Sequence, residues 1–99
     1  MKILIIDDDL MMLRATARAL RSFGWDVATS CAPIDPVGSC VVLSDWHPHG
    51  REMIRRCKLA NIPIVIFTGT PDDVHVHVPI VAKPFDAQNL NDILRKARK

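Results

Sequence analysis

Three carboxylates, one hydroxyl and one ammonium group stand at the ends of apolar runs of the sequence. Asp7 and Asp8 follow "ILII", and Asp45 follows "VVLS". Thr68 follows "IVIF", and Lys83 follows "PIVA". Carboxylates that lie close together raise each other's pKa unless a cation compensates them, and all-oxygen ligation suits Mg²⁺. If these residues meet in space, they predict a Mg²⁺ site with a hydroxyl and a lysine that could hold an anion.

The five polar side chains meet only if the apolar runs are parallel strands of one sheet. In such a sheet, ligands bind beyond the carboxyl ends of the strands. A weaker run at residues 25–29 indicates an edge strand. The other runs are rich in Ile and Val and do not alternate with polar residues, as expected for strands covered on both faces. These four runs are residues 3–6, 41–43, 62–67 and 79–82.

Helical patterns alternate with the predicted strands, which is typical of an α/β fold. We expect one helix at residues 50–60 and another after Asp86, which would be its N-cap. The first helix would begin behind Asp9 as its N-cap. Its apolar residues recur at helical spacing, at Leu10, Leu13, Ala17 and Leu20.

Two connections between the predicted strands are poorly suited to a helix. Parallel neighbours are usually joined by about a dozen residues that include one. Residues 31–40 contain Pro33, Pro36 and Gly38, so we expect one helical turn at most. Residues 69–78 alternate valine with histidine toward their end, which favours an extended segment.

The segments "ILIIDDD", "VVLSDWHPHG", "IVIFTGT" and "VAKPF" in this order resemble the receiver domain of two-component response regulators. The resemblance runs along nearly the whole chain. It implies a doubly wound, flavodoxin-like α/β fold with a five-stranded parallel sheet of order 2-1-3-4-5. The second and fourth helices of that fold would be shortened or missing here. Residues 1–99 would form a single receiver domain without an output domain.

The same resemblance implies a role for each candidate residue. Asp45 would accept a phosphoryl group, Lys83 would pair with that group, and Thr68 would hydrogen-bond one of its oxygens. The peptide bond before Pro84 would be cis. Mg²⁺ would be held by Asp7, Asp8, Asp45 and the backbone carbonyl of His47.

As a stand-alone response regulator, the protein would take its phosphoryl group from a sensor histidine kinase or a histidine phosphotransfer protein. It would then signal through contacts with an output protein whose identity the sequence does not give. It would not be a turnover enzyme.

The sequence also departs from the family pattern. The spacing from Asp45 to Pro48 is one residue shorter than usual, which shortens the loop that supplies the metal carbonyl. Ile80 stands where the family usually has an aromatic switch residue, and the chain has no tyrosine. We therefore expect a remodelled output face.

Composition restricts the function classes. A formal charge of +2 is too small to argue for direct nucleic-acid binding. No apolar run is long enough for membrane insertion, and the N-terminus lacks a signal-type pattern, so we expect a cytoplasmic protein. The cysteines are expected to be buried or half-buried apolar residues: Cys31, Cys40 and Cys57.

Four alternatives stay open at this point. The chain could be a degenerate receiver that acts as an adaptor without phosphorylation. A small Mg²⁺-dependent phosphatase would need a cap, for which 99 residues leave no room. Trp46 could contact a partner or simply cover a loop. Two His-x-His pairs could bind a transition metal or be solvated: His47, His49, His75 and His77.

Overall fold

Five parallel strands form one sheet in the order β2-β1-β3-β4-β5, which confirms the predicted topology. The computed structural model describes residues 1–99. The sheet is a consequence of the apolar runs, because the central strands are buried on both faces while β2 at the edge is half exposed. The strands are β1 (Lys2–Ile6), β2 (Asp26–Ser30), β3 (Val41–Asp45), β4 (Ile64–Thr68) and β5 (Ile80–Ala82).

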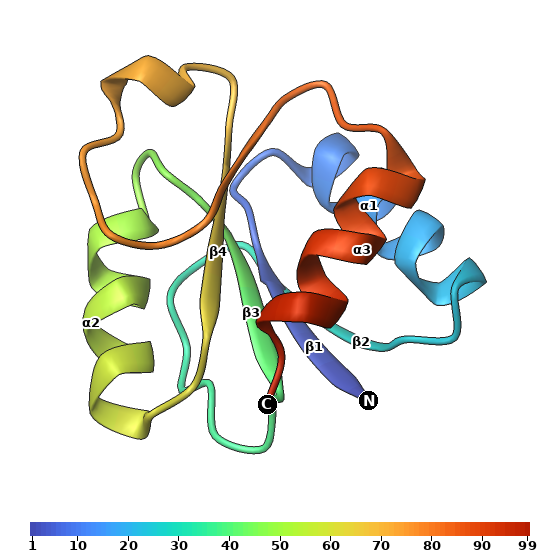
Figure 1. Cartoon of the computed structure of the whole chain (residues 1–99), viewed down its shortest axis with the longest axis horizontal. Helices are drawn as coiled ribbons and strands as arrows, with labels where there is room; N and C mark the ends of the chain where they lie inside the picture. Colours follow the sequence, from blue (N-terminus) through green and yellow to red (C-terminus); the bar gives the residue numbers. More distant parts are fainter.

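Three α-helices cover the sheet unequally. Helices α1 (Leu10–Ser22) and α3 (Ala87–Ala97) lie together on one face, and α2 (Gly50–Ala60) lies on the other (Figure 1). Each face has its own apolar core, and Leu20 and Leu90 are fully buried in the first of them. None of the three helices has the length and apolar character needed to cross a membrane.

Both predicted aspartate caps are confirmed. The Asp9 carboxylate accepts hydrogen bonds from the Met11 and Met12 N–H groups at the start of α1. Asp86 does the same for the first turn of α3. These bonds satisfy N–H groups that have no partner inside the helix, and they fix where each helix begins.

Helix α1 begins at Leu10, as predicted, but Leu10 does not belong to its buried stripe. Its side chain is 54% exposed, and the buried stripe of α1 begins only at Leu13. Leu10 is the first helical residue, beyond the part of α1 that faces the sheet. Thr16 belongs to the buried stripe instead, because its hydroxyl donates to the Met12 carbonyl and so needs no water.

Neither poorly suited connection contains an α-helix, as predicted. Residues 31–40 have no helical turn at all. The segment from β4 to β5 contains only a short 3₁₀ helix, η1 (Pro71–Asp73), followed by irregular chain that bends at residues 76–78, so the predicted extended segment is not continuous. There Val74 is buried and Val76 is half-buried against the second core, while His75 is exposed. Alternating valines thus cover part of the face that a helix would otherwise cover.

Two further details differ from the expectation. Strand β4 begins at Ile64 and not at residue 62, because the Ile62 N–H group donates to the Cys57 carbonyl and closes the end of α2. Cys57 is buried and Cys40 is half-buried as predicted, but Cys31 is exposed. Cys31 lies just after the edge strand, where nothing packs over it.

Candidate functional site

The three acidic residues meet at the carboxyl edge of the sheet. Asp7 directly follows β1, and Asp45 is the last residue of β3, the strand hydrogen-bonded to β1. One carboxylate oxygen from each of Asp7, Asp8 and Asp45 lies within 4.8 Å of the others. Asp7 and Asp45 are only 3% exposed, whereas Asp8 is exposed. The predicted convergence of these carboxylates is therefore present.

Backbone N–H groups hold the Asp45 carboxylate in place. Its Oδ2 accepts from the Asp8 N–H at 3.3 Å, and its Oδ1 accepts from the His49 N–H at 3.3 Å. Burial and, to a smaller extent, the neighbouring Asp7 carboxylate nevertheless raise the pKa of Asp45 to about 6 against the lowering effect of these hydrogen bonds. Asp45 is thus a buried carboxylate whose charge is poorly compensated by the protein alone.

Lys83 directly follows β5 and reaches the acidic cluster along the same carboxyl edge of the sheet. Its Nζ donates to Asp7 Oδ2 at 3.0 Å and lies 5.0 Å from the centre of the Phe67 ring. Its backbone N–H donates to the Thr68 carbonyl at 2.7 Å, and the Lys83–Pro84 bond is cis, as the resemblance implied. The lysine therefore neutralises the Asp7 carboxylate.

Thr68 is buried at the end of β4, next to the backbone of Lys83. Its Oγ1 accepts the Thr70 N–H at 3.1 Å and lies 3.3 Å from the Thr70 hydroxyl. Either hydroxyl can be the donor in the Thr68–Thr70 contact, and when Thr70 donates, the Thr68 proton is available to another acceptor.

The loop after Asp45 is shaped by Trp46. This ring is 5% exposed and packs in the second core, so it covers the loop and offers little surface to a partner. A Cβ on Gly50 would lie 2.6 Å from Trp46 Cε3, which only glycine avoids. His47 is exposed, its carbonyl accepts no hydrogen bond from the chain, and the following bond to Pro48 is also cis. That second cis bond was not predicted.

No histidine belongs to a group of three potential metal ligands. His75 and His77 are exposed between η1 and β5. His49, however, has a role that sequence reasoning missed. Its N–H group binds the Asp45 carboxylate, and its Nε2 is buried without a hydrogen-bond partner. The short spacing from Asp45 to Gly50 was the available signal, because it brings the start of α2 up to the site.

The donor set of the acidic cluster fits a hard divalent cation. Mg²⁺ is bound by carboxylate oxygens and keeps several waters, and Asp8 at the surface leaves one side open to solvent. Three carboxylates against a single lysine also leave an excess of negative charge, which a cation would compensate.

We expect Lys83→Met to destabilise the protein by about 1–3 kcal/mol, because the buried Asp7 carboxylate would lose its charged partner. Urea unfolding at neutral pH measures this loss. Lys58→Met is the matched control, since Lys58 is an exposed lysine on α2 that makes no ion pair. Equal stability in the two variants would contradict the assignment of this ion pair.

Comparison with known proteins gives structural matches only. No protein-family model matches the sequence, and no curated protein matches it. A receiver domain of a sensor histidine kinase from Pseudomonas aeruginosa PAO1 has a TM-score of 0.85 and 21% identity, covering 97% of this chain and 95% of that one. That structure has a magnesium ion coordinated in its active-site cleft.

Two further structures match over similar lengths. A response regulator receiver domain protein from Clostridium thermocellum has a TM-score of 0.82 and 24% identity, covering 97% of this chain and 92% of that one. The receiver domain of the hybrid histidine kinase CckA has a TM-score of 0.77 and 19% identity, covering 98% of both chains. The chain therefore has the fold of response regulator receiver domains.

Proposed function

We propose that residues 1–99 form a receiver domain that accepts a phosphoryl group on Asp45 and signals through protein contacts. The observation that carries this proposal is the buried Asp45 carboxylate at a strand end, between two other carboxylates and the lysine that neutralises one of them. The fold shared with receiver domains supports the same reading.

In the proposed reaction, an Asp45 oxygen attacks phosphorus while the bond from phosphorus to a donor imidazole nitrogen breaks. The donor is a phosphohistidine on a sensor histidine kinase or on a phosphotransfer protein. The N–H groups of Asp8 and His49 orient the attacking carboxylate. Such a transfer needs positioning and charge stabilisation and little covalent chemistry from the protein.

Lys83 and Thr68 would act on the incoming phosphoryl oxygens. The ammonium group of Lys83, now on Asp7, would turn to the phosphoryl group, and the Thr68 hydroxyl would donate to one of its oxygens. Asp7, Asp8, Asp45 and the free carbonyl of His47 would hold Mg²⁺. When bound, this ion would neutralise charge on the phosphoryl oxygens.

Labelling with a small phosphodonor tests the proposal. After incubation with acetyl phosphate and Mg²⁺, intact-mass measurement should find one added phosphoryl group. Asp45→Asn should remove this label, and Asp72→Asn should keep it, because Asp72 is exposed on η1. Absence of a label on the wild-type protein would favour an adaptor that works without phosphorylation.

A further inference from the structure

Helix α2 lacks a neighbouring helix in its layer of the fold. A parallel crossover usually places a helix on the sheet next to its neighbour, but residues 31–40 cross from β2 to β3 without one. Helix α2 is consequently the only α-helix on its face of the sheet (Figure 1). The edge of α2 that faces residues 31–40 is therefore not covered by another helix.

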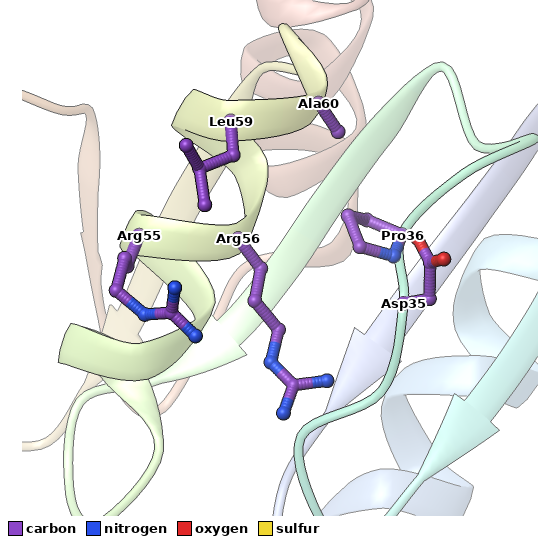
Figure 2. Close-up of a pocket in the computed structure, with 6 residues that line it drawn as sticks. All are labelled: Asp35, Pro36, Arg55, Arg56, Leu59 and Ala60. Carbon is purple, nitrogen blue, oxygen red and sulfur yellow. The ribbon is translucent and has the colours of Figure 1, made fainter.

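A groove of about 370 Å³ runs along this edge. Figure 2 shows Asp35 and Pro36 on one side of it and residues of α2 on the other. Pro36 is buried, whereas Leu59 on the helix is 76% exposed. An isolated exposed leucine is common on protein surfaces, so the exposure of Leu59 indicates a binding site only in combination with the charged residues around it.

The charged residues of α2 are mostly basic, and two of them, Arg55 and Arg56, line the groove together with the acidic Asp35. Glu52 is the only acidic residue of α2, and its carboxylate is bound by Arg55 and by Arg56, at 2.7 Å in each case. Hydrogen bonds from Arg55 and, to a smaller extent, from Arg56 lower the pKa of Glu52 to about 2, so the Glu52 carboxylate is ionised and paired within the helix. The basic residues outnumber it: Arg51, Arg55, Arg56 and Lys58.

Several arginine donors at the groove remain unused. Arg56 donates only through Nε, so its two Nη atoms bind nothing in the chain. Asp35 across the groove forms no ion pair with either arginine, and its Oδ1 accepts the Val37 N–H at 2.9 Å. A free guanidinium fork matches a carboxylate in shape and charge. The leucine lies one turn from Arg55 on the same side of α2.

We propose that the groove between α2 and residues 31–40 docks an acidic amphipathic helix of a partner protein. The partner's carboxylates pair with the free donors of Arg55 and Arg56, and one of its apolar side chains packs between Leu59 and Pro36. The docked helix takes the place in the layer that a crossover helix would normally fill.

The same helix is tied to the proposed phosphorylation site. The His49 N–H, just before α2, binds the Asp45 carboxylate, and Gly50 packs against Trp46. A change at Asp45 would therefore act on the start of α2. The use of the groove as an output surface rests on the proposed function, whereas docking itself does not.

A defined peptide tests the docking surface. The probe is an alanine-based helix of about 16 residues, long enough to be helical, with glutamates and a single leucine on one face. We expect it to bind the unphosphorylated protein and to shift the NMR signals of Arg56, Leu59 and Pro36. The same peptide with lysine in place of glutamate should not bind.

Variants with matched controls locate the binding. Leu59→Ser and Arg56→Met should each weaken binding about tenfold, as at interface hot spots. Met11→Ser likewise removes an exposed apolar side chain and Arg18→Met repeats the arginine change, both on α1, and both should leave binding unchanged. Equal effects of the two pairs, or no preference for the acidic peptide, would overturn the proposal. Self-association that requires Leu59 would overturn it in favour of a second copy of the chain.

Adding beryllofluoride and Mg²⁺ to the same titration separates the two proposals. A change in peptide affinity that Asp45→Asn removes would support the groove as the output face. Peptide binding that beryllofluoride does not alter would overturn that output role and leave the docking site standing. If the wild-type protein binds the peptide but is not labelled by acetyl phosphate, the proposed function is contradicted and the docking site is not.

Discussion

Asp45→Asn is expected to raise the free energy of unfolding at neutral pH, without divalent cations, by about 2 kcal/mol. Burial is the main reason, because together with the Asp7 carboxylate it raises the pKa of Asp45 from 3.8 to about 6. The charged form of Asp45 is therefore disfavoured in the folded protein. Asparagine has a similar shape and cannot ionise, so it removes this cost while losing part of the hydrogen bonding to Asp8 and His49.

The sign of this effect determines the pH at which it is seen. Because the folded protein has the higher pKa, it binds more protons than the unfolded chain between pH 3.8 and about 6. The stabilising contribution of neutral Asp45 is complete below this window and is lost as the pH rises through it. A shift of this size corresponds to about 3 kcal/mol at pH values above the window. Asp45→Asn should therefore gain its advantage between pH 3.8 and about 6.

Urea unfolding of both proteins across this pH range measures the effect. The difference in stability should grow as the pH rises and should level off above pH 6. Asp72→Asn, the same change at an exposed site, should stay close to the wild type throughout. A stability difference between Asp45→Asn and the wild type that does not vary with pH would contradict the burial argument. Saturating Mg²⁺ should stabilise the wild type but not Asp45→Asn, if the proposed ligand set is correct.

Local patterns in the sequence were sufficient to predict most of the fold. The strands were recognisable because a parallel sheet covered on both faces needs continuous apolar runs, such as Ile3–Ile6. Asp9 and Asp86 marked helix starts because capping depends on residues only two or three positions away. Proline and short length ruled out crossover helices in the same local way. The exposure of Leu10 could not be predicted, because periodicity does not show where a helix passes beyond its neighbours.

Contacts between distant parts of the chain could not be predicted in this way. The buried Asn91 accepts a hydrogen bond from the Trp25 indole at 2.8 Å, a pair separated by 66 positions. No local sequence pattern around Trp25 or Asn91 predicts this contact. Lys83 and Asp7 are likewise 76 positions apart. The resemblance predicted that Lys83 would belong to the site, but it predicted a phosphoryl partner, and only the structure shows the pairing with Asp7.

The two adjacent residues Asp8 and Asp9 should respond very differently to alanine. Asp8 contributes an exposed carboxylate to the acidic cluster, whereas the Asp9 carboxylate is turned to the start of α1 and binds the Met11 and Met12 N–H groups. We therefore expect Asp8→Ala to abolish Mg²⁺ binding with little change in stability. Alanine keeps the N–H group that Asp8 donates to Asp45, so the fold of the site is preserved.

Asp9→Ala should instead cost about 1 kcal/mol of stability and leave Mg²⁺ binding largely intact. The cost arises because two helix N–H groups lose their acceptor and a negative charge leaves the positive end of the α1 dipole. Calorimetric Mg²⁺ titration and urea unfolding of both variants distinguish the two roles, and Asp9→Asn, which can still cap the helix, should recover most of the lost stability. Equal loss of Mg²⁺ affinity in Asp8→Ala and Asp9→Ala would mean that both carboxylates serve the metal, and that the cap is secondary.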